Sequence, residues 1–310
     1  MLQPSLSRIV KEAFESPCEE FQRVVEETTS ILSSEDGQIG NFHFLGRLVK
    51  IEPAGNALVI GDLHGDLESL IHILDESNIL RRMQKASDQT IVFLGDYGDR
   101  GPLSAEVYYT VLRLKLHFPR QIVLMRGNHE GPKDVMASPH DLPAQLQARF
   151  GQTWTQAYKK LLTLHQHLYN ASVVQERYLM IHGGPPEQVR TLDDLAYAHL
   201  KHPEQPLLED MLWSDPDETI EGTSPSPRGA GKLFGKKSTD RILDRFRLKV
   251  LLRGHEPCQE GFRTNHDGRV LTLFSRKGPP YFNELGAYLD LNLSERIENA
   301  EQLVRYVHTF

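Results

Sequence analysis

Short runs of aspartate, histidine and asparagine recur along the 310-residue chain, nearly always beside glycine. They read GDLHGD at residues 61–66, GDYGDRG at 95–101, RGNHE at 126–130, HGG at 182–184 and RGHE at 253–256. A plain turn needs one or two glycines and an aspartate, so GDYGDRG carries more charge than turn geometry requires. Carboxylate, imidazole and amide groups bind metals and transfer protons, so the runs predict a chemical site.

Each polar run follows a short apolar segment that is typical of a buried strand. The expected strands are ALVI (57–60), IVFL (91–94), QIVLM (121–125), YLMI (178–181) and KVLL (249–252). Helical patterns alternate with the first of these strands, which predicts an α/β fold. Ligands collect at the carboxyl ends of strands in such sheets, so we expect the polar runs to meet there.

Other segments supply the elements around these strands. Helices are expected at 5–33 (two, amphipathic), 68–77, 104–118, 141–168, 191–200 and 236–246. Further strands are expected at 172–175 and 287–293, with a hairpin around the Asp-Gly turn of GFRTNHDGRVLTLFS. Residues 221–235, EGTSPSPRGAGKLFG, are expected to form a long irregular loop.

The strand-end loops predict a metal site without sulfur. They offer Asp62, His64, Asp96, Asp99, Arg100, Asn128, His129, His182 and His255. Mixed imidazole and oxygen donors suit zinc, manganese or iron, whereas magnesium and calcium favour oxygen alone. With only Asp62 and Asp96 charged among the candidate ligands, two divalent ions leave a charge of about +2, which activates water and attracts a phosphate dianion. In GDYGDRG, Asp96 is placed to hold metal and Arg100 to bind phosphate oxygens.

The ordered motifs GDLHGD, GDYGDRG, RGNHE, HGG, WSDP and RGHE closely resemble those of the phosphoprotein phosphatases. These are metal-dependent serine/threonine phosphatases of the calcineurin-like metallophosphoesterase superfamily. The resemblance runs from about residue 55 to 293, and the short length and GDLHGD form resemble prokaryotic members. It implies a β-sandwich of two mixed sheets flanked by helices. We expect an N-terminal helical leader packed on the core at 1–50, a catalytic domain at 51–293 and a C-terminal tail at 294–310.

The resemblance also implies a role for each site residue. It implies a ligand set with one metal ion on Asp62 and His64, a second on Asn128, His182 and His255, and Asp96 bridging both. Arg100 and Arg228, the latter in SPRG, would bind phosphate together with Asn128. His129 would be the general acid, oriented by Asp99.

The chain departs from the family pattern at two positions. Gly98 stands where the family usually has valine, and RKGPPYFN replaces SAPNY, which leaves Tyr281 as the candidate for the active-site tyrosine. Arg126 and Glu130 flank the Asn-His pair of RGNHE and are expected to be functional or to form a structural ion pair. Histidines outside the motifs, such as His140, are expected on the surface or on helix faces.

Composition narrows the function classes. A net charge of −7 and a pI near 6.1 argue against a general nucleic-acid surface. No apolar stretch resembles a signal peptide or a membrane span, so we expect a cytoplasmic protein. Cys18 and Cys258 lie far apart in sequence, and neither sits in a phosphate-binding loop, which disfavours a disulfide framework and a cysteine-dependent phosphatase.

The leading hypothesis is a protein serine/threonine phosphatase that hydrolyses phosphoproteins or phosphopeptides by in-line attack of a metal-activated hydroxide. Two divalent ions are expected as cofactors, manganese first, with iron and zinc as alternatives. One rival is a small-molecule phosphate hydrolase such as a dinucleoside polyphosphatase, whose relatives tend to carry glutamine where this chain has His64. The other rival is an inactive phosphate-binding scaffold. The sequence identifies no regulatory subunit.

Overall fold

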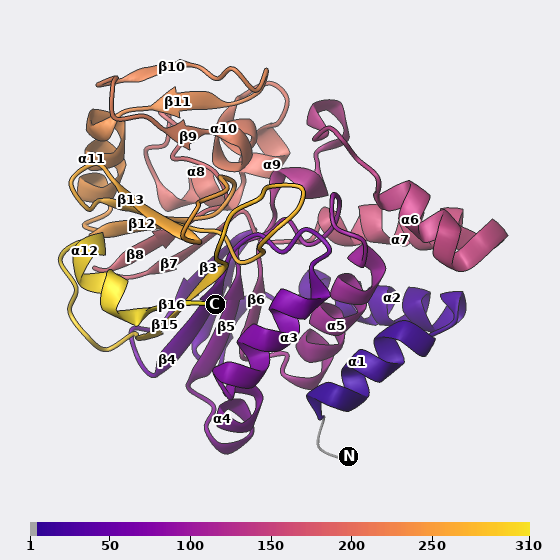
Figure 1. The fold of residues 1–310 in the computed structure, drawn as a ribbon. Coiled ribbons are helices and arrows are strands. Elements are labelled where there is room, and N and C mark those ends of the chain that lie inside the picture. The colour runs from indigo at the N-terminus through magenta and orange to yellow at the C-terminus, as the bar shows by residue number, and fades with distance from the viewer. Residues whose placement is uncertain (1–4) are drawn as a thin grey trace.

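Two large β-sheets face one another, and helices cover their outer faces (Figure 1). The computed structural model describes residues 5–310. One sheet has eight strands, the second has five, and both combine parallel with antiparallel pairs. This arrangement confirms the predicted α/β class, with a β-sandwich of two mixed sheets flanked by helices.

The strands run as follows in sheet order. The eight-stranded sheet contains β1 (Gly37–Ile39), β2 (Phe42–Leu45), β3 (Leu48–Ile51), β7 (Ala171–Val174), β8 (Tyr178–Met180), β12 (Val250–Arg253), β14 (Val270–Leu273) and β13 (Phe262–Asn265). The five-stranded sheet contains β16 (Val307–Thr309), β15 (Ala287–Asn292), β4 (Asn56–Ile60), β5 (Gln89–Phe93) and β6 (Ile122–Leu124). A small third sheet contains β10 (Thr223–Pro225), β11 (Lys232–Phe234) and β9 (Asp215–Pro216).

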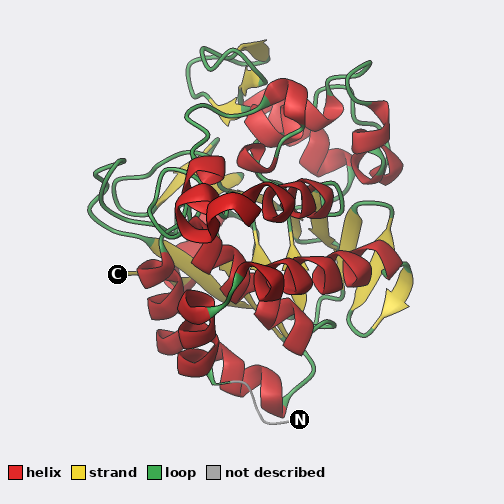
Figure 2. Ribbon diagram, turned by 90° about the vertical axis from the view of Figure 1, so that its right-hand side faces the viewer, coloured by secondary structure: helices red, strands yellow, loops and turns green. Residues whose placement is uncertain are grey.

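Two groups of helices enclose the sheets (Figures 1 and 2). Beside the five-stranded sheet lie α1 (Leu6–Glu15), α2 (Cys18–Ser34), α3 (Leu67–Glu76), α4 (Ile79–Lys85), α5 (Ser104–His117), α6 (Leu142–Phe150) and α7 (Trp154–His165). Beside the eight-stranded sheet lie α8 (Leu192–Ala196), α9 (Ala198–Lys201), α10 (Leu207–Trp213) and α11 (Lys236–Arg245), while α12 (Ala300–Leu303) precedes β16. Among residues 5–310, no helix is both long and apolar enough to cross a bilayer.

Alternation along the strands builds the two cores. In β12, Val250 and Leu252 join the core between the sheets, whereas Leu251 joins the core under α8–α11. In β8, Tyr178 and Met180 face the first core and Leu179 faces the second. Successive side chains of a strand point to opposite faces, so a strand covered on both sides must be apolar throughout.

Three segments differ from the sequence expectations. Residues 37–51, which except for Ile51 lie in the range 1–50 expected to be a helical leader, form β1–β3, and β3 pairs in parallel with β7. Residues 221–235 are not an irregular loop throughout, because β10 pairs with β11, and β11 pairs with β9. The helix expected at 191–200 is divided at Tyr197 into α8 and α9. The strands among them have only two to four residues, and β3 joins the large sheet through β7, which is far away in sequence.

A buried ion pair fastens the N-terminal helices to the core. The Nζ of Lys115, in α5, donates to Glu35 Oε1 at 2.6 Å and to the carbonyls of Pro119 and Ile122 at 2.8 and 2.9 Å. The Lys115 side chain is fully buried, and Glu35, which caps α2, also accepts a hydrogen bond from the Tyr169 hydroxyl. Burial lowers the pKa of Lys115, while Glu35 favours its charged form.

The first prediction concerns this pair. Glu35→Ala should lower the free energy of unfolding by about 3–5 kcal/mol, because Lys115 would keep a buried charge without its counter-charge. Adding Lys115→Met should restore part of the loss, because the unpaired charge is then removed. Urea unfolding of the parent, both single variants and the double variant measures this coupling. A Glu35→Ala variant as stable as the parent would contradict the assignment.

Candidate active site

The predicted site residues meet where strands of both large sheets end. The loops after β4, β5, β6, β8 and β12 carry Asp62 and His64, Asp96, Asn128, His182, and His255, respectively. Strands β4, β5 and β6 are parallel neighbours, as are β8 and β12, so their carboxyl ends share one edge in each sheet. All six side chains are buried there.

Asp96 connects the loops through its backbone and its side chain. Its carbonyl oxygen accepts hydrogen bonds from the amides of Leu63 and His64 at 3.0 and 2.9 Å. Its Oδ1 accepts the amide of His129 at 3.0 Å. The loops after β4 and β6 are therefore both fixed on the loop after β5.

Ligand-type atoms converge around the Asp96 carboxylate. The Nε2 of His64 lies 3.4 Å from Asp96 Oδ2 and 3.6 Å from Asp62 Oδ2. The Nε2 of His182 lies 3.4 Å from Asp96 Oδ2 and 3.1 Å from Asn128 Oδ1. Two groups of residues share this carboxylate, and within each group the potential ligand atoms lie within 4.8 Å of one another. The first group is His64, Asp96 and His129, and the second is Asp96, His182 and His255.

Hydrogen bonds to peptide carbonyls orient two of the imidazoles. The Nδ1 of His64 lies 3.0 Å from the carbonyl oxygen of Gly98, and the Nδ1 of His182 lies 3.0 Å from that of Leu94. An N–H donated at Nδ1 leaves the lone pair on Nε2, which is the atom that faces Asp96. Metal-binding histidines are commonly oriented in this way.

Several buried acceptors fit a metal cation. Within residues 5–310, Asp62 Oδ2 and His255 Nε2 are buried without a hydrogen-bond partner. The amide oxygen of Asn128 lies 3.0 Å from His255 Nδ1, and 3.0 and 3.3 Å from the two carboxylate oxygens of Asp96. Without a cation, the amide would turn over so that its N–H group donates to Asp96, His182 and His255. A cation among these acceptors would instead favour the oxygen facing them. This nitrogen and oxygen donor set fits a transition metal.

The pKa shifts of two of the three imidazoles, His64 and His255, agree with this fit. Burial lowers the pKa of His64 and of His255, which favours the neutral form that binds metal. Burial also opposes the charge on His182, but Asp96 outweighs it and raises the pKa of His182 to about 9. The negative potential that would protonate His182 is the same potential that attracts metal cations.

The site residues occupy an unusual backbone region. Five of them have positive φ angles: His64 at 44°, Asp96 at 55°, Asp99 at 66°, Arg100 at 67° and His255 at 71°. Side chains other than glycine, asparagine and aspartate rarely adopt this region, and such strain is typical of functional sites. Glycine would relieve the strain at each position but would remove the side chain.

Two glycines have a steric role next to the carboxylates. A Cβ on Gly127 would lie 2.1 Å from Asp96 Oδ1, and one on Gly254 would lie 2.3 Å from Asp62 Oδ1. No other residue fits at either position without moving the carboxylate. This agrees with the expectation that glycines let the backbone approach the site.

At Gly98 the neighbouring side chain explains the missing valine. A Cβ there would lie 3.0 Å from Cε2 of Tyr108, which is tighter than ordinary contact. The Tyr108 hydroxyl lies 2.9 Å from Glu130 Oε1, to which it donates, and 3.0 Å from Nε2 of His165. The buried Tyr108 ring therefore occupies the room that a larger residue at 98 would need.

Glu130 organises the two central loops, but not by an ion pair with Arg126. Its Oε2 accepts the amides of Asp96 and Gly127 at 2.8 and 2.9 Å, and its Oε1 accepts the amide of Tyr97 at 3.1 Å. Arg126 donates instead to the backbone carbonyl of Glu130, at 3.2 and 3.3 Å. The expected structural ion pair is thus wrong, because backbone amides occupy the carboxylate.

His129 and Asp99 form a buried pair beside the ligand set. The Nδ1 of His129 lies 2.6 Å from Asp99 Oδ2, and the rings of His129 and His64 stand edge to face with centroids 4.7 Å apart. Burial lowers the pKa of His129, but the nearby Asp96 and Asp99 carboxylates raise it overall. A protonated imidazole fixed at Nδ1 presents its other N–H, at Nε2, as a proton donor.

His140 also belongs to this cluster, so its placement on the surface or a helix face was wrong. Its Nδ1 lies 2.8 Å from Asp99 Oδ2, and its Nε2 lies 2.8 Å from the hydroxyl of Tyr158. The other carboxylate oxygen, Asp99 Oδ1, accepts the amide of Leu142 at 2.7 Å. His140 comes from the loop before α6 and carries no motif, so nothing in its local sequence signals this position.

The structure places Tyr281 beside Arg100. An Nη of Arg100 donates to the Tyr281 hydroxyl at 2.6 Å, and the Tyr281 ring lies 5.3 Å from the His64 ring between centroids. Burial raises the pKa of Tyr281, so the phenol remains protonated. Both side chains therefore border the ligand set.

Arg228 reaches the same site from the loop between β10 and β11. Its Nε donates to Asp215 Oδ2 at 2.6 Å. The other oxygen of Asp215 accepts a hydrogen bond from Arg253 at 2.9 Å and lies 3.9 Å from Nε2 of His255. The partly exposed guanidinium of Arg228 is thus held near the ligand set, not in direct contact with it.

Comparison with known proteins agrees with this geometry. Residues 55–259 match the family model described as calcineurin-like phosphoesterase. A probable serine/threonine-protein phosphatase of Encephalitozoon cuniculi is 30% identical, over 97% of this chain and 63% of its own length, so the chain spans less than two thirds of that relative. A catalytic subunit of protein phosphatase 2A from Dictyostelium discoideum is also 30% identical, over 81% of this chain and 76% of its own length.

A solved structure shares the whole fold. A protein serine/threonine phosphatase from Saccharomyces cerevisiae superposes with a TM-score of 0.78 and 24% sequence identity, over 99% of this chain and 96% of that one. The sequence matches show the family, and the superposition shows the fold. The chain belongs to the calcineurin-like phosphoesterase family, and the relatives it resembles there are serine/threonine protein phosphatases.

Proposed function

We propose that this protein is a metal-dependent phosphatase that hydrolyses phosphoserine and phosphothreonine in proteins. The observation that carries the proposal is the buried set of nitrogen and oxygen ligands around Asp96, next to the His129–Asp99 pair. The relatives named as serine/threonine phosphatases support the substrate class. That the chain is a prokaryotic-type member, and its division into leader, catalytic domain and tail, stay predictions.

Six residues would hold two divalent metal ions. Asp62 and His64 would bind one ion, Asn128, His182 and His255 would bind the other, and Asp96 would contact both. The bound ions would supply a water of lowered pKa as nucleophile and positive charge for the phosphoryl oxygens. Manganese is proposed first, with iron and zinc as alternatives, because imidazole ligands disfavour magnesium and calcium.

The protein's own groups bind the phosphate and provide the proton. Arg100 and Arg228 border the site and would donate to phosphoryl oxygens, with the Asn128 amide beside them. Tyr281 holds the guanidinium of Arg100 through its hydroxyl. His129 keeps its Nδ1 on Asp99, so a proton on Nε2 can pass to the leaving oxygen of serine or threonine.

The second prediction tests the metals. Chelation should abolish phosphopeptide hydrolysis, and manganese should restore more activity than magnesium, because the ligand set contains three imidazoles. Elemental analysis should find two ions per chain in the restored enzyme. Full turnover by protein shown to be metal-free would overturn the two-metal site. Turnover of dinucleoside tetraphosphate, but not of phosphopeptide, would favour the small-molecule hydrolase.

The third prediction tests the proton donor. His129→Asn should reduce hydrolysis of a phosphoserine peptide by about 10²–10⁴-fold, because an alkoxide leaving group needs a proton in the transition state. The loss on 4-nitrophenyl phosphate should be much smaller, because nitrophenolate leaves without that proton. Metal content should not change, and His72→Asn, an exposed histidine on α3, serves as the matched control. Equal losses on both substrates would assign His129 to another role.

A further inference from the structure

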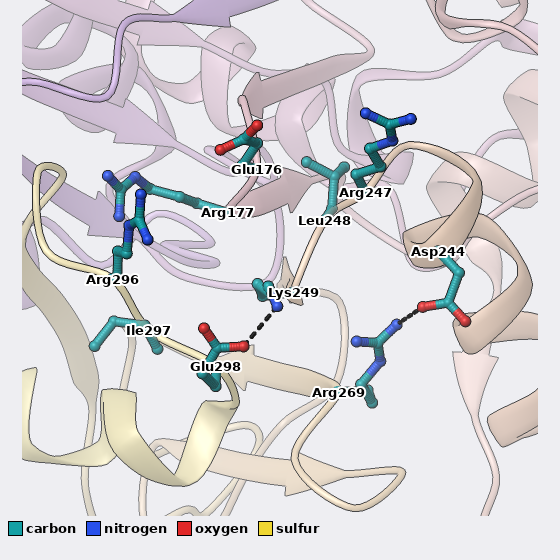
Figure 3. Close-up of a pocket in the computed structure, with 10 residues that line it drawn as sticks. All are labelled: Glu176, Arg177, Asp244, Arg247, Leu248, Lys249, Arg269, Arg296, Ile297 and Glu298. Carbon is teal, nitrogen blue, oxygen red and sulfur yellow. Dashed lines mark hydrogen bonds and ion pairs between the residues drawn. The ribbon is translucent and has the colours of Figure 1, made fainter.

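A charged pocket lies at the opposite ends of two strands that carry the active site. Its cavity volume is about 480 Å³, and its lining includes Arg177 and Lys249. Arg177 directly precedes β8 and Lys249 directly precedes β12, whereas His182 and His255 follow those strands. The pocket is therefore separate from the metal ligands, and Figure 3 shows its lining side chains.

Positive charge predominates in this pocket. Its charged lining residues are Arg177, Arg247, Lys249, Arg269, Arg296, Glu176, Asp244 and Glu298. Two ion pairs form within it, Lys249 with Glu298 at 2.5 Å and Arg269 with Asp244 at 2.6 Å (Figure 3). Three arginines and one carboxylate remain, which leaves a charge of +2 on a chain whose net charge is −7.

Two of the remaining arginines, Arg177 and Arg296, lie next to each other in the pocket. The guanidinium of Arg177 donates to the carbonyls of Ser294 and Glu295, which directly precede Arg296, and Figure 3 shows both guanidinium groups on the same wall. The carbonyls fix Arg177 without neutralising it, and its Nε is buried without a partner among the described residues. Two like charges brought together in this way favour an anion between or above them.

The third arginine occupies a position that normally favours glycine. Arg247 follows the end of α11 with a φ of 56°, in the left-handed region where helices commonly place glycine. Its side chain forms no hydrogen bond or ion pair within residues 5–310. Beside it, Leu248 and Ile297, each only about 2% exposed, give the pocket a small apolar edge.

We propose that this pocket binds a small organic phosphate, a dianion with a compact apolar body. Arg177, Arg247 and Arg296 would contact the phosphate, and the apolar body would lie on Leu248 and Ile297. The volume is that of small-ligand sites. The proposal is independent of the reaction at the metal site, because none of these residues contacts the ligand set.

The fourth prediction uses arginine-specific labelling of the metal-loaded enzyme with phenylglyoxal, read out by peptide mass spectrometry. Phenylphosphonate, a dianion with an apolar ring and no hydrolysable ester, should slow labelling of Arg247 and Arg296 about tenfold at about ten times its Kd. Inorganic phosphate should protect the same residues at higher concentration, because it lacks the ring. Exposed Arg245, at the end of α11 but outside the pocket, should label at an unchanged rate.

A double variant provides an independent test. Arg247→Ala/Arg296→Ala should bind about one phenylphosphonate fewer per chain in equilibrium dialysis, while its phosphopeptide turnover without added ligand stays at the parent level. Arg245→Ala should bind as the parent does. Absence of protection at Arg247 and Arg296, equal protection of Arg245, or unchanged binding by the double variant would each overturn the proposal.

The hydrogen bonds around Asp99 support a second proposal, which rests on the proposed function. The two imidazoles of His129 and His140 share one oxygen of Asp99, at 2.6 and 2.8 Å, and Tyr158 holds the far side of His140. We infer that His140 is a positioning residue that fixes the Asp99 carboxylate, and through it the ring of His129. The loop before α6 thereby becomes part of the proton-donor assembly.

The fifth prediction separates this role from a structural one. His140→Ala should lower kcat for a phosphoserine peptide about tenfold with little change in KM, because misplacement of an acid affects the transition state and not substrate binding. Turnover of 4-nitrophenyl phosphate and metal content should change little. His140→Asn should recover much of the loss, since its amide N–H can replace Nδ1 on Asp99.

The matched variant Tyr158→Phe removes only the hydroxyl and should cause a smaller loss of the same kind. Equal losses on both substrates, or no recovery in His140→Asn, would overturn the role of His140. A parent enzyme that fails to hydrolyse either substrate would instead overturn the proposed function.

Discussion

The active site depends on the burial of one carboxylate, that of Asp96. Burial alone would raise its pKa, but neighbouring histidines, His182 first, hold the pKa well below its usual value. Its amide is bound by Glu130, and its carbonyl and Oδ1 accept amides from the adjacent loops. A buried charge is tolerated only when it is paired and hydrogen-bonded, so the loops around Asp96 must be polar and closely packed. The three glycines of GDYGDRG and the single glycine of RGNHE fit this constraint.

Histidine side chains have two proposed roles in the site, metal ligand and proton donor. The group that is hydrogen-bonded to Nδ1 distinguishes the two roles. His64 and His182 donate from Nδ1 to peptide carbonyls, which fixes their rings and leaves Nε2 as a ligand atom. His129 points its Nδ1 at the carboxylate of Asp99, which favours the protonated ring. The raised pKa of His182 comes from Asp96 on its Nε2 side, where a cation would bind. The hydrogen-bond geometry thus supports the roles proposed for these histidines, metal ligand for His64 and His182 and proton donor for His129.

The sequence predicted the strand-end residues because their signal is local. An apolar strand followed by glycine, aspartate and histidine places the polar group at the carboxyl end of the strand, wherever the rest of the chain goes. Two contacts were missed, that of His140 with Asp99 and that of Glu130 with the amide of Asp96. Each joins segments that are distant in sequence, and no local sequence motif links them. The short strands β1–β3 and β9–β11 were missed because a strand of two to four residues carries too little pattern of its own, even where its partner is the next strand along the chain.

The two proposed anion sites use opposite ends of β8 and β12 and arise from opposite causes. At the carboxyl ends, His182 and His255 are proposed as ligands, and attraction of phosphate depends on the metal ions they would hold. At the amino ends, arginine side chains such as Arg177 supply the positive charge directly. Strands of three and four residues span about 10–13 Å, so the residues before and after them lie at least that far apart along the sheet. Coupling between the two sites would require an element with two arrangements, which two central strands of one sheet do not provide. The geometry thus favours independent binding at the two ends.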